Sequence, residues 1–394
     1  MQTLEEFYEF TQRLHTTRQA ITSAYIARTN DPYDVSVLQN GLHAIDKLPG
    51  DKLNKRLIVG DAEATVRLDY ERRELERDIF FLEHSAQELQ EKLARENDKF
   101  ASEVEGTVNF LRNIPIRTFL TDRDGTINNY CGHYRSSHQP IYNAVFLTTY
   151  ARSCPEQSVI LTSAPLEPHG IIDLNAIPER TVSLAGSKGR EYLSVHNTRG
   201  EMEIPHEQGE KLQQLNARLA DLLDEEGCRK FAFIGSGVQY KFGQTTVARQ
   251  DIHNTISDEA SQRFLERVQS LVTNVDPEGT TFQIEDTGKD IEIMLTIEGA
   301  REFTKGDGVA FLAKELELPL ESGTTLVCGD TASDVPMVEK IAELAGTTNT
   351  ATIFVTEDRA LRDRVRETVK DHWFVSSPDV LVTALYKIGL KVER

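Results

Sequence analysis

Two carboxylates one residue apart, followed by a glycine and a threonine, are the residues best suited to chemistry in this sequence. Asp122 and Asp124 come directly after the strand-like run 117–120, and Gly125 and Thr126 follow them. An aspartate at the end of a strand can attack phosphorus and form an aspartyl-phosphate. A second carboxylate beside it can protonate the leaving oxygen and deprotonate the attacking one. The spacing favours phosphoryl chemistry, and an ordinary Asx-rich turn is the alternative.

A second pair of carboxylates follows another predicted strand near the end of the chain. The apolar run 324–328 is followed by Gly329 and then by Asp330 and Asp334. Mg2+ prefers hard oxygen ligands in an octahedral array and usually keeps several waters. Because Asp122 could join Asp330 and Asp334 in supplying such oxygens, the sequence predicts a Mg2+ site.

Two further residues could contact a phosphate. Thr162 follows the apolar run 158–161, and a hydroxyl and backbone N–H groups just past a strand can donate hydrogen bonds to phosphate. Lys305 precedes a predicted helix over 309–315, where its charge could neutralise a phosphate or the Asp122 carboxylate. An ordinary strand end and a solvated lysine are the alternatives, so the order of these features along the chain carries the argument.

The composition limits the class of protein. The 394 residues are enough for two or three domains, and the formal net charge of -19 argues against nucleic acid or an anionic membrane as the main partner. No apolar run approaches the roughly 18 residues that span a bilayer, and the acidic start lacks a signal-peptide core. The four cysteines are scattered, as is typical of reduced thiols. We therefore expect a soluble, cytoplasmic protein.

Residues 1–112 have helical patterning and show no chemistry of their own. Leu68, Leu75, Leu82 and Leu89 recur every seven residues, with charged residues on the other faces. Such a heptad seam predicts a helical bundle or an antiparallel coiled coil. Self-association or packing is the simplest role for this domain, and docking of a partner protein is the alternative.

The rest of the chain is predicted to be an α/β core with an α+β insertion. Strand-like runs in the core segments 113–184 and 301–394 predict a doubly wound parallel sheet. The intervening residues 185–300 mix helices and strands and are predicted to form a separate domain. Helices are expected there over 207–223 and 256–272, and strands over 231–234, 282–285 and 290–297.

The order of these motifs resembles that of the haloacid dehalogenase (HAD) superfamily. That order is Asp122-x-Asp124-Gly-Thr, then Thr162, then Lys305, then Gly329-Asp330-x-x-x-Asp334. The resemblance covers about residues 115–394 and implies a HAD-like fold, and the long insertion resembles the type 2 cap domain of the superfamily.

Within this superfamily the chain most resembles trehalose-6-phosphate phosphatases. Residues 185–191 stand where those enzymes enter the cap, and residues 291–293 with Lys305 are similar to their cap exit. The helical domain ahead of the first motif resembles the nematode-type branch. The resemblance implies a phosphoric monoester hydrolase of carbohydrate metabolism that acts on trehalose 6-phosphate.

Two motifs depart from the usual pattern and leave other functions open. The fourth reads Gly-Asp-Thr-Ala-Ser-Asp in place of Gly-Asp-Asp-x-Thr-Asp, and the second reads Thr-Ser-Ala-Pro in place of Ser-Gly-Arg. A phosphatase of another sugar phosphate, of the glucosylglycerol- or sucrose-phosphate type, is the main alternative. A phosphomutase ranks lower, because mutases usually carry a smaller cap. A non-catalytic sugar-phosphate sensor or scaffold is disfavoured, because all four motifs are intact.

The resemblance also implies a role for each core residue. Asp122 would attack phosphorus, and Asp124 would protonate the leaving sugar oxygen and then deprotonate the hydrolytic water. Thr162 and Lys305 would hold the phosphoryl oxygens. Mg2+ would be bound by Asp122, Asp330 and the Asp124 carbonyl, with Asp334 in direct contact or one layer further out.

The cap would select the substrate and close over the core to exclude water. A neutral, hydroxyl-rich sugar requires carboxylates and cationic or amide donors that face inward. A surface charge is the alternative for each basic candidate. By position, the candidates are Lys188, Arg190, Lys241, Arg249 and, as the first choice, Glu292.

Overall fold

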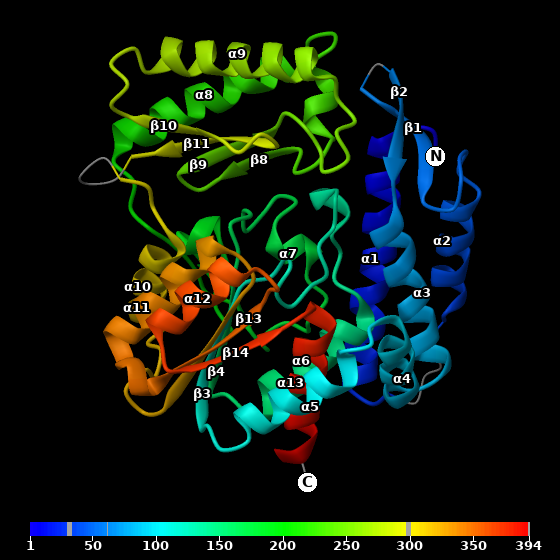
Figure 1. The fold of residues 1–394 in the computed structure, drawn as a ribbon. Coiled ribbons are helices and arrows are strands. Elements are labelled where there is room, and N and C mark those ends of the chain that lie inside the picture. Colours follow the sequence, from blue (N-terminus) through cyan, green and yellow to red (C-terminus); the bar gives the residue numbers. More distant parts are fainter. Residues whose placement is uncertain (30–33, 61, 297–300, 393–394) are drawn as a thin grey trace.

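The structure is a computed structural model that describes residues 1–29, 34–60, 62–296 and 301–392. Figure 1 shows three parts: helices of the N-terminal region beside a sheet-containing core, and a separate antiparallel sheet with two helices above that core. The predicted fold class is confirmed in these three parts. Among the described residues, no helix combines the length and the apolar character needed to cross a membrane.

The N-terminal part is mainly helical, as predicted, but it also contains a β-hairpin. Its helices are α1 (Leu4–Ile26), α2 (Ser36–Asp46), α3 (Asp69–Glu83), α4 (Ala86–Glu96) and α5 (Phe100–Leu111), and its strands are β1 (Asn54–Val59) and β2 (Ala62–Arg67).

The heptad-spaced leucines do not lie on one continuous helix. Leu68 precedes α3, Leu75 and Leu82 lie on α3, and Leu89 lies on α4. The break falls at Ser85, whose side chain caps α4 by accepting the Glu88 N–H. The seam therefore serves packing within a bundle, and a long coiled coil is absent from the described residues.

The core sheet has the strand order β14-β13-β12-β3-β4-β5-β6-β7 and is parallel from β14 to β5. Successive residues of the central strands face two separate cores: Phe119 packs with α6 and α13, and Leu120 packs with α10 and α11. Burial of both strand faces explains why these runs are apolar throughout. The strands are β3 (Ile116–Thr121), β4 (Gln157–Leu161), β5 (Ser183–Gly186), β6 (Glu191–Leu193), β7 (Arg199–Glu201), β12 (Thr324–Gly329), β13 (Thr350–Val355) and β14 (Asp371–Val375), and the helices are α6 (Ile141–Ser153), α7 (Ile171–Leu174), α10 (Lys305–Glu315), α11 (Val335–Ala345), α12 (Arg359–Thr368) and α13 (Pro378–Val392).

The direction of strand addition reverses between β3 and β12. The chain runs outward from β3 through β4 to β5, and later outward from β12 through β13 to β14. In open α/β sheets such a switch point, at the carboxyl ends of the strands, is where ligands bind. The loops that follow β3 and β12 therefore face the expected ligand site.

The inserted part contains an antiparallel sheet of order β10-β11-β9-β8, with two helices on one face. Strands β5 to β7 pair within the main sheet, which thus extends to Glu201, beyond residue 184. The elements of the insertion are α8 (His206–Asp224), β8 (Val238–Lys241), β9 (Gln244–Ala248), α9 (Asp258–Val275), β10 (Phe282–Asp286) and β11 (Asp290–Leu295).

Two details of the insertion differ from the prediction. The predicted strand over 231–234 is wrong, because a 3-10 turn covers Arg229–Ala232 and Phe231 is buried by stacking on Phe264 rather than by strand pairing. A short apolar run cannot distinguish these two outcomes. The helix predicted over 256–272 begins slightly later, at the N-cap Ser257. Residue 297, at the end of the last predicted strand, lies outside the described residues.

Candidate active site

Three carboxylates from two loops converge at the switch point of the core sheet. Asp122 directly follows β3, and Asp330 directly follows β12, the strand paired with β3. Asp334 lies in the short 3-10 turn after β12. One oxygen atom from each of these carboxylates lies within 4.8 Å of the others. The predicted convergence of Asp122, Asp330 and Asp334 is therefore present in the structure.

Lys305 is the cation at the centre of this cluster. Its Nζ lies 2.5 Å from Asp122 Oδ1 and 2.6 Å from Asp334 Oδ1. The lysine is the first residue of α10, where a capping box between Thr304 and Asp307 fixes the start of the helix. Burial alone would lower the pKa of Lys305, but attraction to both carboxylates raises the pKa above its ordinary value. The lysine is therefore charged.

The carboxylates carry more negative charge than Lys305 can balance. Burial, together with the neighbouring Asp334, raises the pKa of Asp122 to about 7 against the effect of Lys305. Burial and the charges of Asp122 and Asp334 raise the pKa of Asp330 to about 9. A set of hard oxygen donors with excess negative charge fits a divalent cation such as Mg2+.

Asp334 differs from the other two carboxylates because backbone N–H groups of its own loop donate to it. Its Oδ1 accepts a hydrogen bond from Lys305, and its Oδ2 accepts the N–H groups of Asp330 and Thr331, each at 3.0 Å. Burial would raise the pKa of Asp334, but Lys305 and these N–H groups lower it below its usual value. The residue is suited to orienting the loop after β12.

Gly125 and Thr126 allow the two loops to approach each other. Gly125 has a φ of +85°, and a Cβ atom there would lie 2.2 Å from Asp330 Oδ2. Both the backbone conformation and the space therefore require glycine. The Thr126 Oγ1 lies 3.2 Å from Asp122 Oδ2 and also 3.2 Å from Asp330 Oδ1, so its hydroxyl bridges the two loops.

Asp124 lies beside this cluster and is partly open to solvent. Its Oδ1 accepts hydrogen bonds from Arg123 Nη1 at 2.5 Å and from Ser137 Oγ at 3.0 Å. The side chain of Asp124 is 24% exposed, whereas that of Arg123 is 4% exposed. A cavity of about 130 Å³ next to Asp124 lies between the core loop and the antiparallel sheet, and its lining includes Ser236 and Asp290.

Thr162 directly follows β4, the other neighbour of β3. The residue is buried, and its Oγ1 accepts the Ala164 N–H at 3.2 Å. Its backbone carbonyl accepts the Lys188 N–H at 2.9 Å, which joins the end of β4 to the short turn after β5. Thr162, as predicted from its position after a strand, thus lies at the same edge of the sheet as Asp122 and Asp330.

Three of the five predicted substrate-binding residues are gathered between the core and the antiparallel sheet. Lys188 Nζ lies 2.5 Å from Glu302 Oε1 and 3.9 Å from Glu292 Oε2. Glu292 also accepts a hydrogen bond from Gln244 Nε2 at 2.9 Å. Burial lowers the pKa of Lys241 to about 8, and the charge of Glu292 opposes this shift.

The other two predicted residues make structural contacts. Arg190 Nη1 donates to the Gly243 carbonyl at 3.0 Å, and its guanidinium lies 4.2 Å from the centre of the Phe303 ring. Arg249 donates to Asp286 at 2.9 Å and to Ser261 at 3.2 Å, within the antiparallel-sheet unit. These contacts hold the two guanidinium groups in place, and among the described residues neither forms a hydrogen bond or ion pair with Glu292.

Sequence reasoning missed three residues that contact the site directly. Thr126 had a signal, because it belongs to the first motif. Arg123 lies between the two motif aspartates, but nothing in the sequence indicated that its side chain returns to Asp124. Ser137 carried no signal, because its position depends on how the loop after β3 folds back.

Two families of known proteins match the sequence. The family described as "Trehalose-6-phosphate phosphatase, C-terminal" matches residues 119–381. The family described as "Trehalose-6-phosphate phosphatase N-terminal helical bundle domain" matches residues 3–103.

Several curated relatives match most of the chain. A trehalose-phosphatase of Brugia malayi is 31% identical over 98% of this chain and 86% of its own length. One of Caenorhabditis briggsae is 29% identical over 100% of this chain and 98% of its own length. Alpha,alpha-trehalose-phosphate synthase (UDP-forming) 2 of Aphelenchoides avenae is 33% identical over 80% of this chain, and the matched region is 25% of that protein. The chain thus spans about a quarter of the length of this last relative.

A solved structure of the Candida albicans trehalose-6-phosphate phosphatase C-terminal domain is also similar. It has 14% identity and a TM-score of 0.46, and the similarity covers 73% of this chain and 96% of that one. The family match over 119–381 and the near full-length similarity to the Brugia malayi protein agree with each other. On these grounds the chain belongs to the trehalose-6-phosphate phosphatase family.

Proposed function

We propose that this protein is a Mg2+-dependent phosphatase that hydrolyses trehalose 6-phosphate to trehalose and phosphate through an aspartyl-phosphate on Asp122. The observation that carries the proposal is the cluster of Asp122, Asp330 and Asp334 around one lysine at the switch point of the sheet. Family membership supports the substrate.

Asp122 has the surroundings of a nucleophile. The side chain is held from one side by Lys305 Nζ and from the other by the Thr126 hydroxyl, which fixes its orientation at the end of β3. Lys305 would reduce the repulsion between this carboxylate and the phosphate dianion. Thr162, at the end of β4, would donate to a phosphoryl oxygen. In phosphoryl transfer such positioning and charge stabilisation supply most of the catalysis.

Asp124 is the proposed general acid and base. Its side chain is the more open of the two motif carboxylates, and both of its hydrogen bonds in the described chain fall on Oδ1. The Oδ2 atom is therefore left to face a ligand. We assign to it the proton donated to the leaving sugar oxygen, and afterwards the proton removed from the hydrolytic water.

Asp122 and Asp330 would hold Mg2+ with the Asp124 carbonyl, and Asp334 would orient the loop from outside. This division follows from the two backbone N–H groups of the loop after β12 that Asp334 Oδ2 already accepts. When bound, the ion would offset the negative charge of the phosphoryl oxygens.

The inserted unit is the proposed cap, predicted over 185–300, and the pairing of β7 in the main sheet favours a start after Glu201. Lys188, Lys241 and Glu292 are the residues of this region that we assign to the sugar, because they combine donors and an acceptor beside the core. Arg190 and Arg249 are better assigned to structure. We further infer a cytoplasmic location, because the four cysteines are free thiols. We also propose that the N-terminal helices mediate self-association.

The test is phosphate release from a panel of sugar phosphates by the wild-type protein and by Asp124→Asn. We expect trehalose 6-phosphate to be the best substrate, the activity to require Mg2+ and to be lost with a chelator, and the variant to lose about 10²-fold or more. A preference for sucrose phosphate or glucosylglycerol phosphate would replace the proposed substrate. Absence of phosphate release from every sugar phosphate would overturn the proposal.

A further inference from the structure

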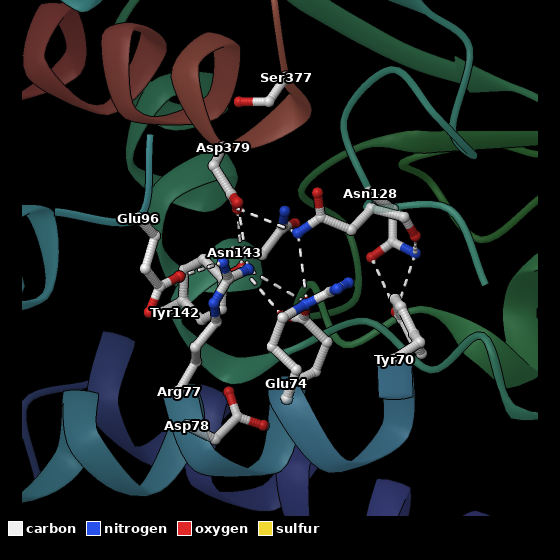
Figure 2. Close-up of polar contacts among 12 residues, drawn as sticks. Tyr70, Glu74, Arg77, Asp78, Glu96, Asn128, Tyr142, Asn143, Ser377 and Asp379 are labelled. Carbon is white, nitrogen blue, oxygen red and sulfur yellow. Dashed lines mark hydrogen bonds and ion pairs between the residues drawn. The ribbon is translucent and has the colours of Figure 1, made fainter. Parts of the chain in front are cut away.

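A series of buried hydrogen bonds links the N-terminal helices to Asp124. It begins at Tyr70, on the first turn of α3, which is 3% exposed. The Tyr70 hydroxyl has one proton, which goes to the His138 carbonyl oxygen at 2.9 Å. The hydroxyl oxygen then accepts the side-chain amide of Asn128 at 3.0 Å, and Figure 2 shows these two side chains facing each other. Tyr70 therefore contacts the loop after β3 at two points.

The same loop returns to Asp124 through a serine. Asn128 Nδ2 also lies 3.3 Å from Ser137 Oγ, and Ser137 Oγ donates to Asp124 Oδ1 at 3.0 Å. Because the single Ser137 proton is taken by the carboxylate, its oxygen is an acceptor, for Arg123 Nη1 at 3.2 Å as well as for Asn128 Nδ2. The Asn128 amide also lies 3.2 Å from the Asn129 carbonyl oxygen. Asn128 thus donates both to Tyr70 and to Ser137, and Ser137 donates to Asp124, so the four residues form one connected series.

A second contact holds the neighbouring residue, Asn129. Its amide nitrogen lies 3.3 Å from Glu74 Oε1 on α3 and 3.1 Å from Asp379 Oδ1 at the start of α13. Arg77 bridges the same two carboxylates (Figure 2). Helix α3 therefore holds the start of the loop at two consecutive residues, and Glu71 of the same helix accepts a hydrogen bond from Ser136. Of these contacts, the series from Tyr70 is the one that reaches Asp124 through side-chain hydrogen bonds.

We propose that Tyr70 is a positioning residue for Asp124, acting through Asn128 and Ser137. The inference rests on the proposed function, because it takes Asp124 as the general acid. A proton donor must lie within hydrogen-bond reach of the leaving oxygen, and a displacement of about 1 Å can lower the rate by about 10²-fold. The N-terminal helical part would then be a support of the active site as well as a surface for packing.

The test uses two aryl phosphates in the presence of Mg2+. Phenolate is a poor leaving group that depends on a proton donor, whereas 4-nitrophenolate leaves with little assistance. Since kcat/KM covers the departure of the leaving group, we expect Tyr70→Phe to lower kcat/KM for phenyl phosphate about tenfold. For 4-nitrophenyl phosphate we expect a change of about twofold at most. A merely structural defect would lower both values equally, and that result would overturn the inference.

Tyr8→Phe is the matched control. The Tyr8 hydroxyl is also on an N-terminal helix and donates to a backbone carbonyl, that of Phe233, at 2.6 Å, but the bond leads to the inserted unit and not to Asp124. The control should leave the ratio of the two kcat/KM values unchanged. A ratio altered to the same extent as in Tyr70→Phe would contradict the inference.

A double-mutant cycle tests the connection itself. Ser137→Ala should reproduce the selective loss with phenyl phosphate. In the double variant with Tyr70→Phe, the total loss of kcat/KM should be smaller than the product of the two single losses. Independent effects would overturn the inference. If Tyr70→Phe does not fold, Asn128→Ala interrupts the same series and must show the same selectivity. Failure of the proposed function would appear in the wild-type protein, whereas failure of this inference appears only in the variants.

Discussion

In the described part of the chain, the Arg77 cluster and the Lys305 cluster each place three carboxylates around one cationic side chain, and they differ in how well the charges are balanced. Arg77 reaches all three of its carboxylates, Glu96 at 2.8 Å, Asp379 at 3.1 Å and Glu74 at 3.2 Å. Lys305 reaches only Asp122 and Asp334.

The difference follows from the two cations and their neighbours. A guanidinium has five N–H donors in a planar fork, whereas an ammonium is a compact point charge. The Arg77 cluster also receives hydrogen bonds from neutral partners, from Tyr142 (Figure 2) and from Asn129. The Lys305 cluster leaves Asp330 without a cation, and the pKa of that carboxyl lies near 9. The first cluster is complete and joins two parts of the chain, while the second has a place for another positive charge.

The largest expected effect concerns the nucleophile. Asp122→Asn should abolish phosphate release, by on the order of 10⁴-fold or more, because the amide cannot form the aspartyl-phosphate. In Mg2+-free buffer its free energy of unfolding should stay the same or rise, because the change reduces the excess of carboxylates over the single charge of Lys305, which still pairs with Asp334. Phosphate assays and denaturant unfolding measure the two quantities. A variant that remained active would refute the assignment, and a large loss of stability would show that this cluster is structural after all.

Removal of Arg77, the cation of the other cluster, should instead lower the free energy of unfolding. Arg77→Met leaves Asp379 buried without a cation and leaves Glu74 with Arg73 as its cationic partner, which should lower the free energy of unfolding by about 3–5 kcal/mol. Denaturant unfolding measures the loss. Arg67→Met, which breaks an exposed pair with Asp69, should cost about 1 kcal/mol or less and serves as the control. Equal losses in the two variants would contradict the contrast between the clusters.

Glu71 provides a pH test of an uncompensated carboxyl outside both clusters. Burial raises its pKa from 4.5 to about 7, against hydrogen bonds from Ser136 and Cys131. Because the folded state holds the proton more tightly, the stabilising effect is present below pH 4.5 and is lost as the pH rises through 7. The loss amounts to about 3 kcal/mol. Glu71→Gln should remove this part of the pH dependence in unfolding curves, and an unchanged pH profile would count against the assignment.

The smallest effect is that of Mg2+ on stability. At a concentration about tenfold above the dissociation constant, Mg2+ should raise the free energy of unfolding of the wild-type protein by about 1.4 kcal/mol. Asp330→Asn should lose most of this increase and Arg77→Met should retain it, because only the first change removes a proposed ligand. Thermal unfolding with and without Mg2+ measures the shift. An equal response in all three proteins would place the ion elsewhere.

The sequence was sufficient to predict the core of the site. Asp122, Thr162 and Asp330 each follow an apolar run, and parallel pairing of those runs brings their ends to one edge of the sheet. Local order along the chain thus translated directly into spatial proximity.

What could not be predicted depends on how loops and insertions fold back. Ser137 reaches Asp124 only because the loop after β3 returns, and no local pattern encodes that return. Phe231 lies in an apolar run that serves equally well in a turn, and Ser85 divides a leucine repeat that alone indicated one long helix. For Arg190, the residue type indicated a donor but not that backbone carbonyls would occupy it.

The absence of a side chain at Gly125 bears on the size of the ion that the proposed site would prefer. With no side chain there, Asp330 can come so close to the first loop that even a methyl group would collide with its oxygen. Mg2+ bonds oxygen at about 2.0–2.1 Å, whereas Ca2+ requires about 2.3–2.6 Å and more ligands. A bulkier residue would spread the two loops and widen the cage toward the larger ion. We therefore expect the glycine to favour Mg2+ over the larger Ca2+ at the proposed site.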